Sequence, residues 1–162
     1  MGKKGVTSDV VDAVTGVGVK RSGLLTPQQL AKSGTEHGEQ AALFCWAALQ
    51  VKSKPGIDWM YAIPNGGERN RIVAGQMKAE GVKSGIHDVC LPVARGGYFG
   101  LYIEMKRADR GEMSDKQLDF QRHLVLYGYA SVLAHGWVQA VNAIETYYRW
   151  PYTVIVGERM IP

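Results

Sequence analysis

Two acids and a lysine near the middle of the chain have residue types and a spacing that could do chemistry. Glu104 and Lys106 lie two residues apart in an apolar stretch with a period of two, so a strand over residues 98–106 would place both side chains on one face. Asp88 stands at the start of the preceding apolar run, and the two carboxylates could meet at neighbouring strand ends. Paired carboxylates provide the oxygen ligands that Mg²⁺ or Mn²⁺ accepts. A lysine beside them can stabilise charge on a phosphate or help to orient and deprotonate water.

A Glu-x-Lys pair is a weak signal by itself, because the same spacing recurs on solvated strands as a surface salt-bridge ladder. Three neighbouring features favour the chemical interpretation. The pair lies in a strongly hydrophobic strand, Asp88 ends a Gly-rich turn, and a helix that carries a glutamine follows at short range. Met105, between the pair, should point into the core, as expected for a strand that is buried on one side.

The elements that must position these residues alternate in type along the 162-residue chain. Helices are expected over residues 36–52, 69–80, 114–127 and 137–148, and strands over residues 59–63, 87–91, 98–106 and 129–134. The first helix follows an N-cap residue, Thr35, and is apolar all round, so it should be largely buried. This order predicts an α/β domain with a mixed central sheet flanked by helices.

One domain over residues 34–149 accounts for these elements. Residues 1–33 carry Gly, Ser, Thr and Lys with scattered apolar residues, and we expect an N-terminal arm in which Thr26-Pro27 could start one helical turn. Residues 150–162 are expected to form a tail with a short β-like run. The four tryptophans are expected in the core or at an interface; they are Trp46, Trp59, Trp137 and Trp150.

The composition is that of a soluble globular protein, with 46% hydrophobic and 21% charged residues. The net charge of +4 and the pI of about 9.1 are compatible with a polyanionic partner but do not identify one. No apolar run approaches the ~18 residues that cross a bilayer, and the N-terminus lacks a secretory signal, so a cytoplasmic location without membrane partners is expected. Cys45 and Cys90 lie alone in apolar surroundings and are expected to be buried thiols.

Four consecutive sequence blocks resemble a known family. They span residues 62–67, 81–88, 100–106 and 114–117, and they contain Pro-Asn-Gly-Gly, His-Asp, Glu-Met-Lys and Ser-Asp-Lys-Gln. In order and spacing they look like the VRR-NUC domain of the PD-(D/E)XK nuclease superfamily, and the resemblance extends over about residues 36–148. It implies a restriction-endonuclease-like core, and it implies an enzyme that hydrolyses DNA phosphodiesters with Mg²⁺ or Mn²⁺.

The resemblance also implies roles for particular residues. The metal ligands would be Asp88 and Glu104, with Glu39 as the acid of the first helix that completes the metal site. Lys106 would be the catalytic lysine and Gln117 the helix glutamine near the site. The residues expected to contact DNA are Asn65, Arg69, Arg71, Lys83 and Ser84.

Several of these roles have alternatives in the sequence itself. Glu36 could replace Glu39 in the metal site, because either acid could instead be a first-turn residue favoured by the helix dipole. Gln117 follows Ser114 by three residues and could simply close a capping box. Asn65 could be a turn residue, and the arginines after it could form a solvated face.

The chain departs from the family at His87, where a proline usually precedes the aspartate. Histidine could act as a ligand or proton carrier, or it could be a polar residue hydrogen-bonded at the start of a strand. Stand-alone phage and bacterial members of the family are associated with DNA repair, with Holliday junctions and other branched DNA, and with homodimers. The resemblance therefore implies a homodimeric endonuclease that recognises DNA through its backbone and shape.

Two functions from other classes remain open. One is a non-catalytic DNA-binding module on a nuclease fold, and the other is a metal-dependent hydrolase of RNA or small phosphoesters. Two adjacent carboxylates that face a polyanion argue against the binding module, because like charges close together are costly without a cation.

Overall fold

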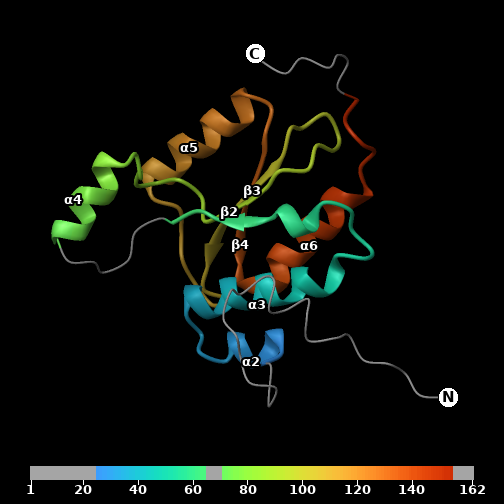
Figure 1. Ribbon diagram of the computed structural model, residues 1–162, viewed down its shortest axis with the longest axis horizontal. Helices are drawn as coiled ribbons and strands as arrows, with labels where there is room; N and C mark the ends of the chain where they lie inside the picture. Colours follow the sequence, from blue (N-terminus) through green and yellow to red (C-terminus); the bar gives the residue numbers. More distant parts are fainter. Residues whose placement is uncertain (1–24, 65–70, 155–162) are drawn as a thin grey trace.

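The computed structural model describes residues 25–64 and 71–154, in which a four-stranded sheet forms the centre (Figure 1). In spatial order, the strands are β1 (Tyr61–Ala62), β2 (Val89–Leu91), β3 (Leu101–Lys106) and β4 (Ala130–His135). The pairs β1–β2 and β2–β3 are antiparallel, whereas β3–β4 is parallel. The predicted mixed sheet is confirmed.

Helices cover both faces of this sheet. On one face, α3 (Glu36–Gln50) and α6 (Gly136–Arg149) pack against β3. On the other face, α5 (Asp115–Leu126) brings the ring of Phe120 edge-on to Tyr102 of β3, with 5.8 Å between ring centroids. The result is a three-layered α/β arrangement in which the two faces of β3 meet different helices.

The core lies between the sheet and the α3–α6 layer. From β3, it takes Leu101, Ile103 and Met105, each at most 4% exposed, and this confirms the predicted direction of Met105. The α6 helix adds Ile144 and Tyr147, which are also buried. The alternation along β3 therefore sends Glu104 and Lys106 to the opposite face, under α5.

The helix starts follow from local capping. At α3, the Thr35 hydroxyl accepts a hydrogen bond from the Gly38 amide at 3.0 Å, as its predicted N-cap role requires. At α5, both hydrogen bonds of the Ser114–Gln117 capping box are present. That helix stops before Gly128, whose φ of +80° is a backbone conformation that favours glycine.

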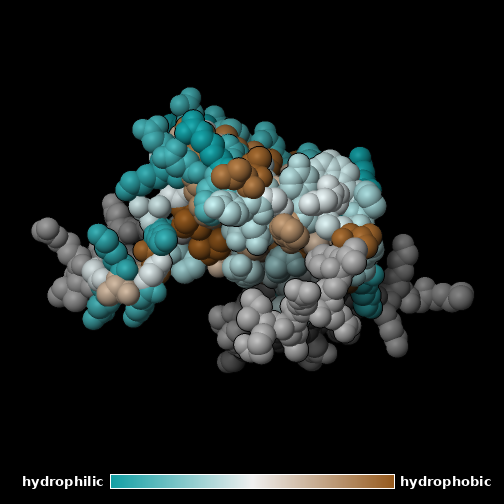
Figure 2. Space-filling view, turned by 90° about the horizontal axis from the view of Figure 1, so that it is seen from above, coloured by the Kyte–Doolittle hydropathy of each residue, from teal (hydrophilic) through white to brown (hydrophobic). Residues whose placement is uncertain are grey.

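Two short helices lie outside the layers. The helix α2 (Pro27–Ala31) begins at Thr26, as its sequence indicates, and packs against α3. The helix α4 (Arg71–Ala79) projects from one side of the molecule (Figures 1 and 2). None of the helices within the described ranges is long and apolar enough to cross a bilayer.

The first predicted strand, over residues 59–63, is wrong in its extent. Ile57–Trp59 forms a 3₁₀ turn, and β1 contains only Tyr61–Ala62. The turn follows Gly56, whose φ of +84° redirects the chain, so the apolar run that begins at Trp59 starts outside the sheet. For the same reason Trp59 is 73% exposed and does not lie in the core.

The two cysteines differ in burial. Cys90 is 3% exposed in β2, as expected for a buried thiol. Cys45 is only half-buried on α3, and burial raises the pKa of its thiol. Neither forms a disulfide.

Arg95 holds the chain that follows α6 against the domain. It is 7% exposed, and its Nη1 donates to the carbonyl oxygens of Tyr148 and Trp150 at 3.2 and 3.1 Å. Its guanidinium also stacks on the rings of Tyr148 and Tyr152, with 4.6 and 4.0 Å from the guanidinium carbon to the ring centroids. A planar guanidinium can do both, whereas a lysine ammonium cannot.

We therefore predict that Arg95→Lys lowers the free energy of unfolding by roughly 1–3 kcal/mol, because two carbonyl groups and two aromatic faces lose their partner. Urea unfolding followed by circular dichroism measures this. Arg149→Lys, at an exposed position on the end of α6, is the matched control and should unfold like the wild type. Equal stability of the Arg95 and Arg149 variants would contradict this account.

Candidate active site

Glu104 and Lys106 lie side by side on the α5 face of β3, as their spacing predicts. Glu104 is 1% exposed and Lys106 is 9% exposed, so this pair is buried rather than part of a solvated ladder. The Lys106 Nζ donates to Glu104 Oε1 at 2.9 Å. The bend after β3 is tight, because a Cβ at Gly111 would lie 3.0 Å from the Lys106 Cδ.

Asp88 reaches the same end of the sheet from the neighbouring strand. It immediately precedes β2, where Val89 is paired with Ile103 of β3. Its Oδ2 accepts a hydrogen bond from the Met105 amide at 2.9 Å, which ties the carboxylate to β3 next to Glu104. The structure thus brings the three predicted central residues together.

The two carboxylates repel one another. Burial first, and then the negative charge of Glu104, raise the pKa of Asp88 from its ordinary 3.8 to about 6. The Met105 amide and the Lys106 ammonium act in the opposite direction, and the charge of Glu36 adds to the rise. Burial and the charge of Glu104 therefore both disfavour the ionised form of Asp88, and a bound cation would offset both effects.

Gln117 joins α5 to this site and also caps the helix. Its Nε2 donates to Glu104 Oε1, and its Oε1 lies 3.4 Å from Lys106 Nζ. The same Oε1 accepts from the Ser114 amide at 2.8 Å, which closes the capping box. The two alternatives weighed from the sequence are therefore combined in one side chain.

Glu39 points to a different part of the fold. It is 4% exposed, and its Oε2 accepts a hydrogen bond from the Trp137 amide at 2.8 Å, at the N-terminus of α6. Within the described ranges no hydrogen bond joins Glu39 to Asp88 or Glu104. Glu36 is exposed on the same helix, and its charge acts on Asp88.

The described residues expected to contact DNA lie on the turn before Asp88. Lys83 and Ser84 are exposed, and Lys116 at the start of α5 donates to the Ser84 hydroxyl at 3.2 Å. Asn65 and Arg69 lie outside the described residues. Arg71 begins α4, but its side chain also lies outside the described part of the chain.

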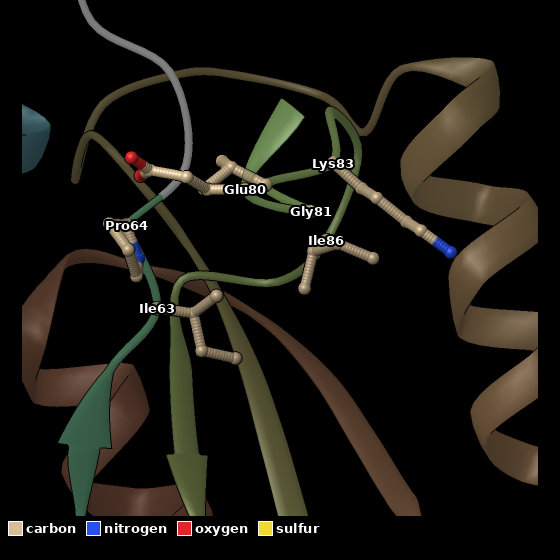
Figure 3. A pocket seen from close by; sticks show the side chains of 7 residues that line it. Ile63, Pro64, Glu80, Gly81, Lys83 and Ile86 are labelled. Carbon is tan, nitrogen blue, oxygen red and sulfur yellow. The ribbon is translucent and has the colours of Figure 1, made fainter. Parts of the chain in front are cut away.

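A pocket of about 390 Å³ adjoins the site (Figure 3). Its apolar wall includes Ile63 and Ile86, while the side chains of Glu80 and Lys83 extend from it in opposite directions. The Ile63 amide donates to the Asp88 carbonyl oxygen at 2.7 Å, which connects the wall of the pocket to the backbone of Asp88.

Two residues of the site were missed by the sequence analysis. The Oγ of Ser131, on β4, lies 2.8 Å from the Nε2 of His87. The side-chain amide of Gln121, on α5, donates a hydrogen bond to the same Oγ at 3.3 Å. The one serine among the apolar and aromatic residues of the predicted strand over residues 129–134 is the signal that could have indicated Ser131. Gln121 lies one helical turn after Gln117, on the same face.

The carboxylate pair fits a divalent cation. Glu104 Oε2 is buried and accepts no hydrogen bond from the residues that the structure describes. Mg²⁺ commonly takes one or two protein carboxylates and keeps several waters or phosphate oxygens as its other ligands. In the described ranges no three His, Cys, Asp or Glu side chains form a ready-made metal cage, so the other ligands would come from solvent, substrate or an acid of α3.

The raised pKa of Asp88 leads to a prediction about stability without metal. Because the folded-state pKa of about 6 lies above the ordinary 3.8, stability falls as pH rises between these values and stays lower above them. In EDTA at pH 8, Asp88→Asn should therefore be more stable than the wild type, by roughly 1–2 kcal/mol after allowance for solvent screening.

Thermal unfolding at pH 3.5 and pH 8 measures this effect. The amide oxygen that Asp88→Asn introduces can still accept from Met105, so the backbone contact is retained and the gain should vanish at the lower pH. Asp119→Asn, on the exposed side of α5, is the matched control and should show no such gain. A wild type that is as stable as Asp88→Asn at pH 8 would show that neither burial nor the charge of Glu104 destabilises the ionised Asp88.

Comparison with known proteins agrees with the fold and the sequence blocks. No family model matches the chain, and no curated protein matches it. A solved structure described as a VRR-NUC domain protein matches with a TM-score of 0.63 and 28% sequence identity, over 73% of this chain and 91% of that chain. That neighbour has the PD-(D/E)XK type of α/β fold. The shared fold, together with the four sequence blocks, supports a VRR-NUC domain in this chain.

Proposed function

We propose that this protein is a divalent-metal-dependent DNA endonuclease. The observation that carries the proposal is the group of Asp88, Glu104 and Lys106 at one end of the sheet, in which Glu104 and Lys106 are buried and Asp88 is partly buried. Two neighbouring carboxylates, one of them buried, with one nearby ammonium are costly in a protein that binds no cation there. It supports phosphodiester hydrolysis, and it is not needed for simple DNA binding.

Asp88 and Glu104 would hold Mg²⁺ or Mn²⁺. A bound cation of this type polarises a phosphate oxygen and lowers the pKa of water, which supplies a nucleophile near neutral pH. The contacts with Glu104 and Gln117 fix the position of the Lys106 ammonium, which would lie next to the phosphate that reacts. There it stabilises the charge that develops on the phosphate oxygens. Gln117, in the first turn of α5, contacts Glu104 and Lys106 and so fixes their positions relative to this helix.

An acid of α3 is proposed to complete the metal site. Glu39 is the candidate that the family resemblance implies, and Glu36 is the alternative favoured by its effect on the Asp88 pKa. The carboxylate of Glu39 has one oxygen bonded to α6, which leaves the second oxygen for a ligand or for water.

DNA would be held by the basic residues around the acid pair. Lys83 and Lys116 lie on one side, and Arg107 and Arg110 follow Lys106 in the chain. Asp109 lies within 3.9 Å of both arginines and keeps them close to each other. Contacts of this type reach phosphates rather than base edges, so affinity should depend strongly on salt. Asn65, Arg69, Arg71 and Ser84 remain proposed DNA contacts.

Branched DNA, including Holliday junctions, is the proposed substrate class, and a homodimer is the proposed assembly. A two-fold symmetric dimer would place two sites for cleavage of two strands at a symmetric junction. Roles in DNA repair, a phage origin and a cytoplasmic location belong to the same proposal. An RNA or small-phosphoester hydrolase and a non-catalytic DNA-binding module are the competing functions.

Cleavage assays test the proposed function. Labelled four-way junction, flap, duplex and RNA substrates are incubated with Mg²⁺, Mn²⁺ or EDTA. We expect cutting of branched DNA with either metal and none in EDTA. Lys106→Ala and Asp88→Ala should each lose about 100-fold or more in rate, roughly 3 kcal/mol of transition-state stabilisation, while DNA binding is retained.

Lys32→Ala, at an exposed position after α2, is the control for loss of a positive charge and should cut like the wild type. Wild-type protein that binds DNA but cuts it with no metal would support the binding module instead. Preferential cutting of RNA would support the competing hydrolase.

The acid of α3 can be identified separately. If Glu39 is a ligand, Glu39→Gln should lower the cleavage rate at least about tenfold, while its amide oxygen still accepts from Trp137 and preserves the fold. Glu36→Gln should then change the rate by less than about threefold. Titration of Mn²⁺ dependence for both variants provides the measurement. The reverse order of effects would assign the role to Glu36.

A further inference from the structure

His87 is enclosed in the site from two sides. Its side chain is fully buried, and its ring lies edge-on to Phe120 of α5, with 5.4 Å between the centroids. Its Nε2 is 2.8 Å from the Ser131 hydroxyl oxygen, and its Nδ1 is 3.4 Å from Glu104 Oε2. The ring therefore bridges β4 and the carboxylate that β3 contributes to the proposed metal site.

The direction of the hydrogen bonds follows from the donors around Ser131. The Gln121 amide nitrogen can only donate, so the Ser131 oxygen accepts from it. The Ser131 hydroxyl can then donate its own proton to His87 Nε2, and in the arrangement that we infer Nε2 is the acceptor. A neutral ring that accepts at Nε2 carries its proton on Nδ1, and a charged ring carries one there as well. In both states Nδ1–H faces Glu104.

The Glu104 carboxylate needs this neighbour. Its Oε1 accepts from both Lys106 and Gln117, whereas its Oε2 accepts no hydrogen bond from the described residues. The Nδ1 of His87 lies 3.4 Å from Oε2, so a small closing movement would let its N–H donate to one lone pair and leave the second for a cation. Carboxylates that bind metals are commonly oriented by such outer hydrogen bonds, whose loss costs about 10–100-fold in metal affinity.

We propose that His87 is a positioning residue that orients Glu104 Oε2 toward the divalent cation, with Ser131 and Gln121 fixing the ring. The inference rests on the proposed metal-dependent function. It assigns the histidine a specific task at the position where related domains have a proline, which cannot donate to a carboxylate.

The ring tautomer is the first test, and it needs no substitution. Long-range ¹H–¹⁵N NMR of the histidines in the full-length protein with EDTA should show a proton on His87 Nδ1. His87→Asn identifies the signal by its disappearance. A neutral ring protonated on Nε2 could not donate to Glu104 and would overturn the proposal.

Two variants distinguish the roles of the two ring nitrogens of His87. In His87→Asn the side-chain amide nitrogen occupies the place of Nδ1 and can still donate to Glu104. In His87→Gln the amide reaches the place of Nε2, near Ser131, and the contact with Glu104 is lost. Calorimetric titration with MnCl₂ should give an affinity within about threefold of the wild type for the asparagine variant and about 10–100-fold weaker for the glutamine variant.

Ser131→Ala provides a variant that leaves the histidine in place. Alone, Ser131→Ala should weaken Mn²⁺ binding. Combined with His87→Gln, it should cause no further loss of Mn²⁺ affinity, because the two residues act through one carboxylate. Equal Mn²⁺ affinity of His87→Gln and the wild type would overturn the positioning role. If the wild type itself bound no Mn²⁺, the proposed nuclease function would fail, and the tautomer alone would then decide whether His87 orients Glu104.

Discussion

The burial of the Glu104 carboxylate is the interaction on which this domain depends most. A carboxylate that is 1% exposed must be surrounded by donors, because leaving it without partners costs several kcal/mol. Lys106 comes from the same strand, Gln117 from α5 and His87 from the segment before β2. The positions of three separate elements are therefore set by one charged group.

The same requirement explains why helix capping and chemistry share residues at α5. Gln117 can reach Glu104 because the helix starts two residues earlier, and the helix starts there because Ser114 and Gln117 cap it. A shift of the helix start by one residue would turn Gln117 away by about 100°. The local signal that begins the helix thus also fixes the register of the site.

Much of this arrangement could be predicted from the sequence because it depends on local rules. The period of two in β3 placed Glu104 and Lys106 together on one face, and capping patterns located the starts of α3 and α5. What could not be predicted depends on contacts between distant segments. Ser131 lies 44 residues from His87, and Glu39 lies 98 residues from the Trp137 amide that it binds. No local periodicity carries such pairings, since they arise only when the sheet and its helices assemble.

Glu39 and Glu104 show how similar residues acquire different tasks through their surroundings. Both are buried acids in apolar segments, and each accepts donors. Glu39 meets an uncharged helix N-terminus through one carboxylate oxygen, and the helix dipole favours its negative charge. Glu104 shares its space with Asp88, so the two negative charges remain undercompensated by the single lysine ammonium. The ionised form of Asp88 therefore lowers the stability of the metal-free fold, and a cation bound by the two carboxylates, as proposed above, would offset that loss. Such local conflict between folding and charge is what functional sites characteristically retain.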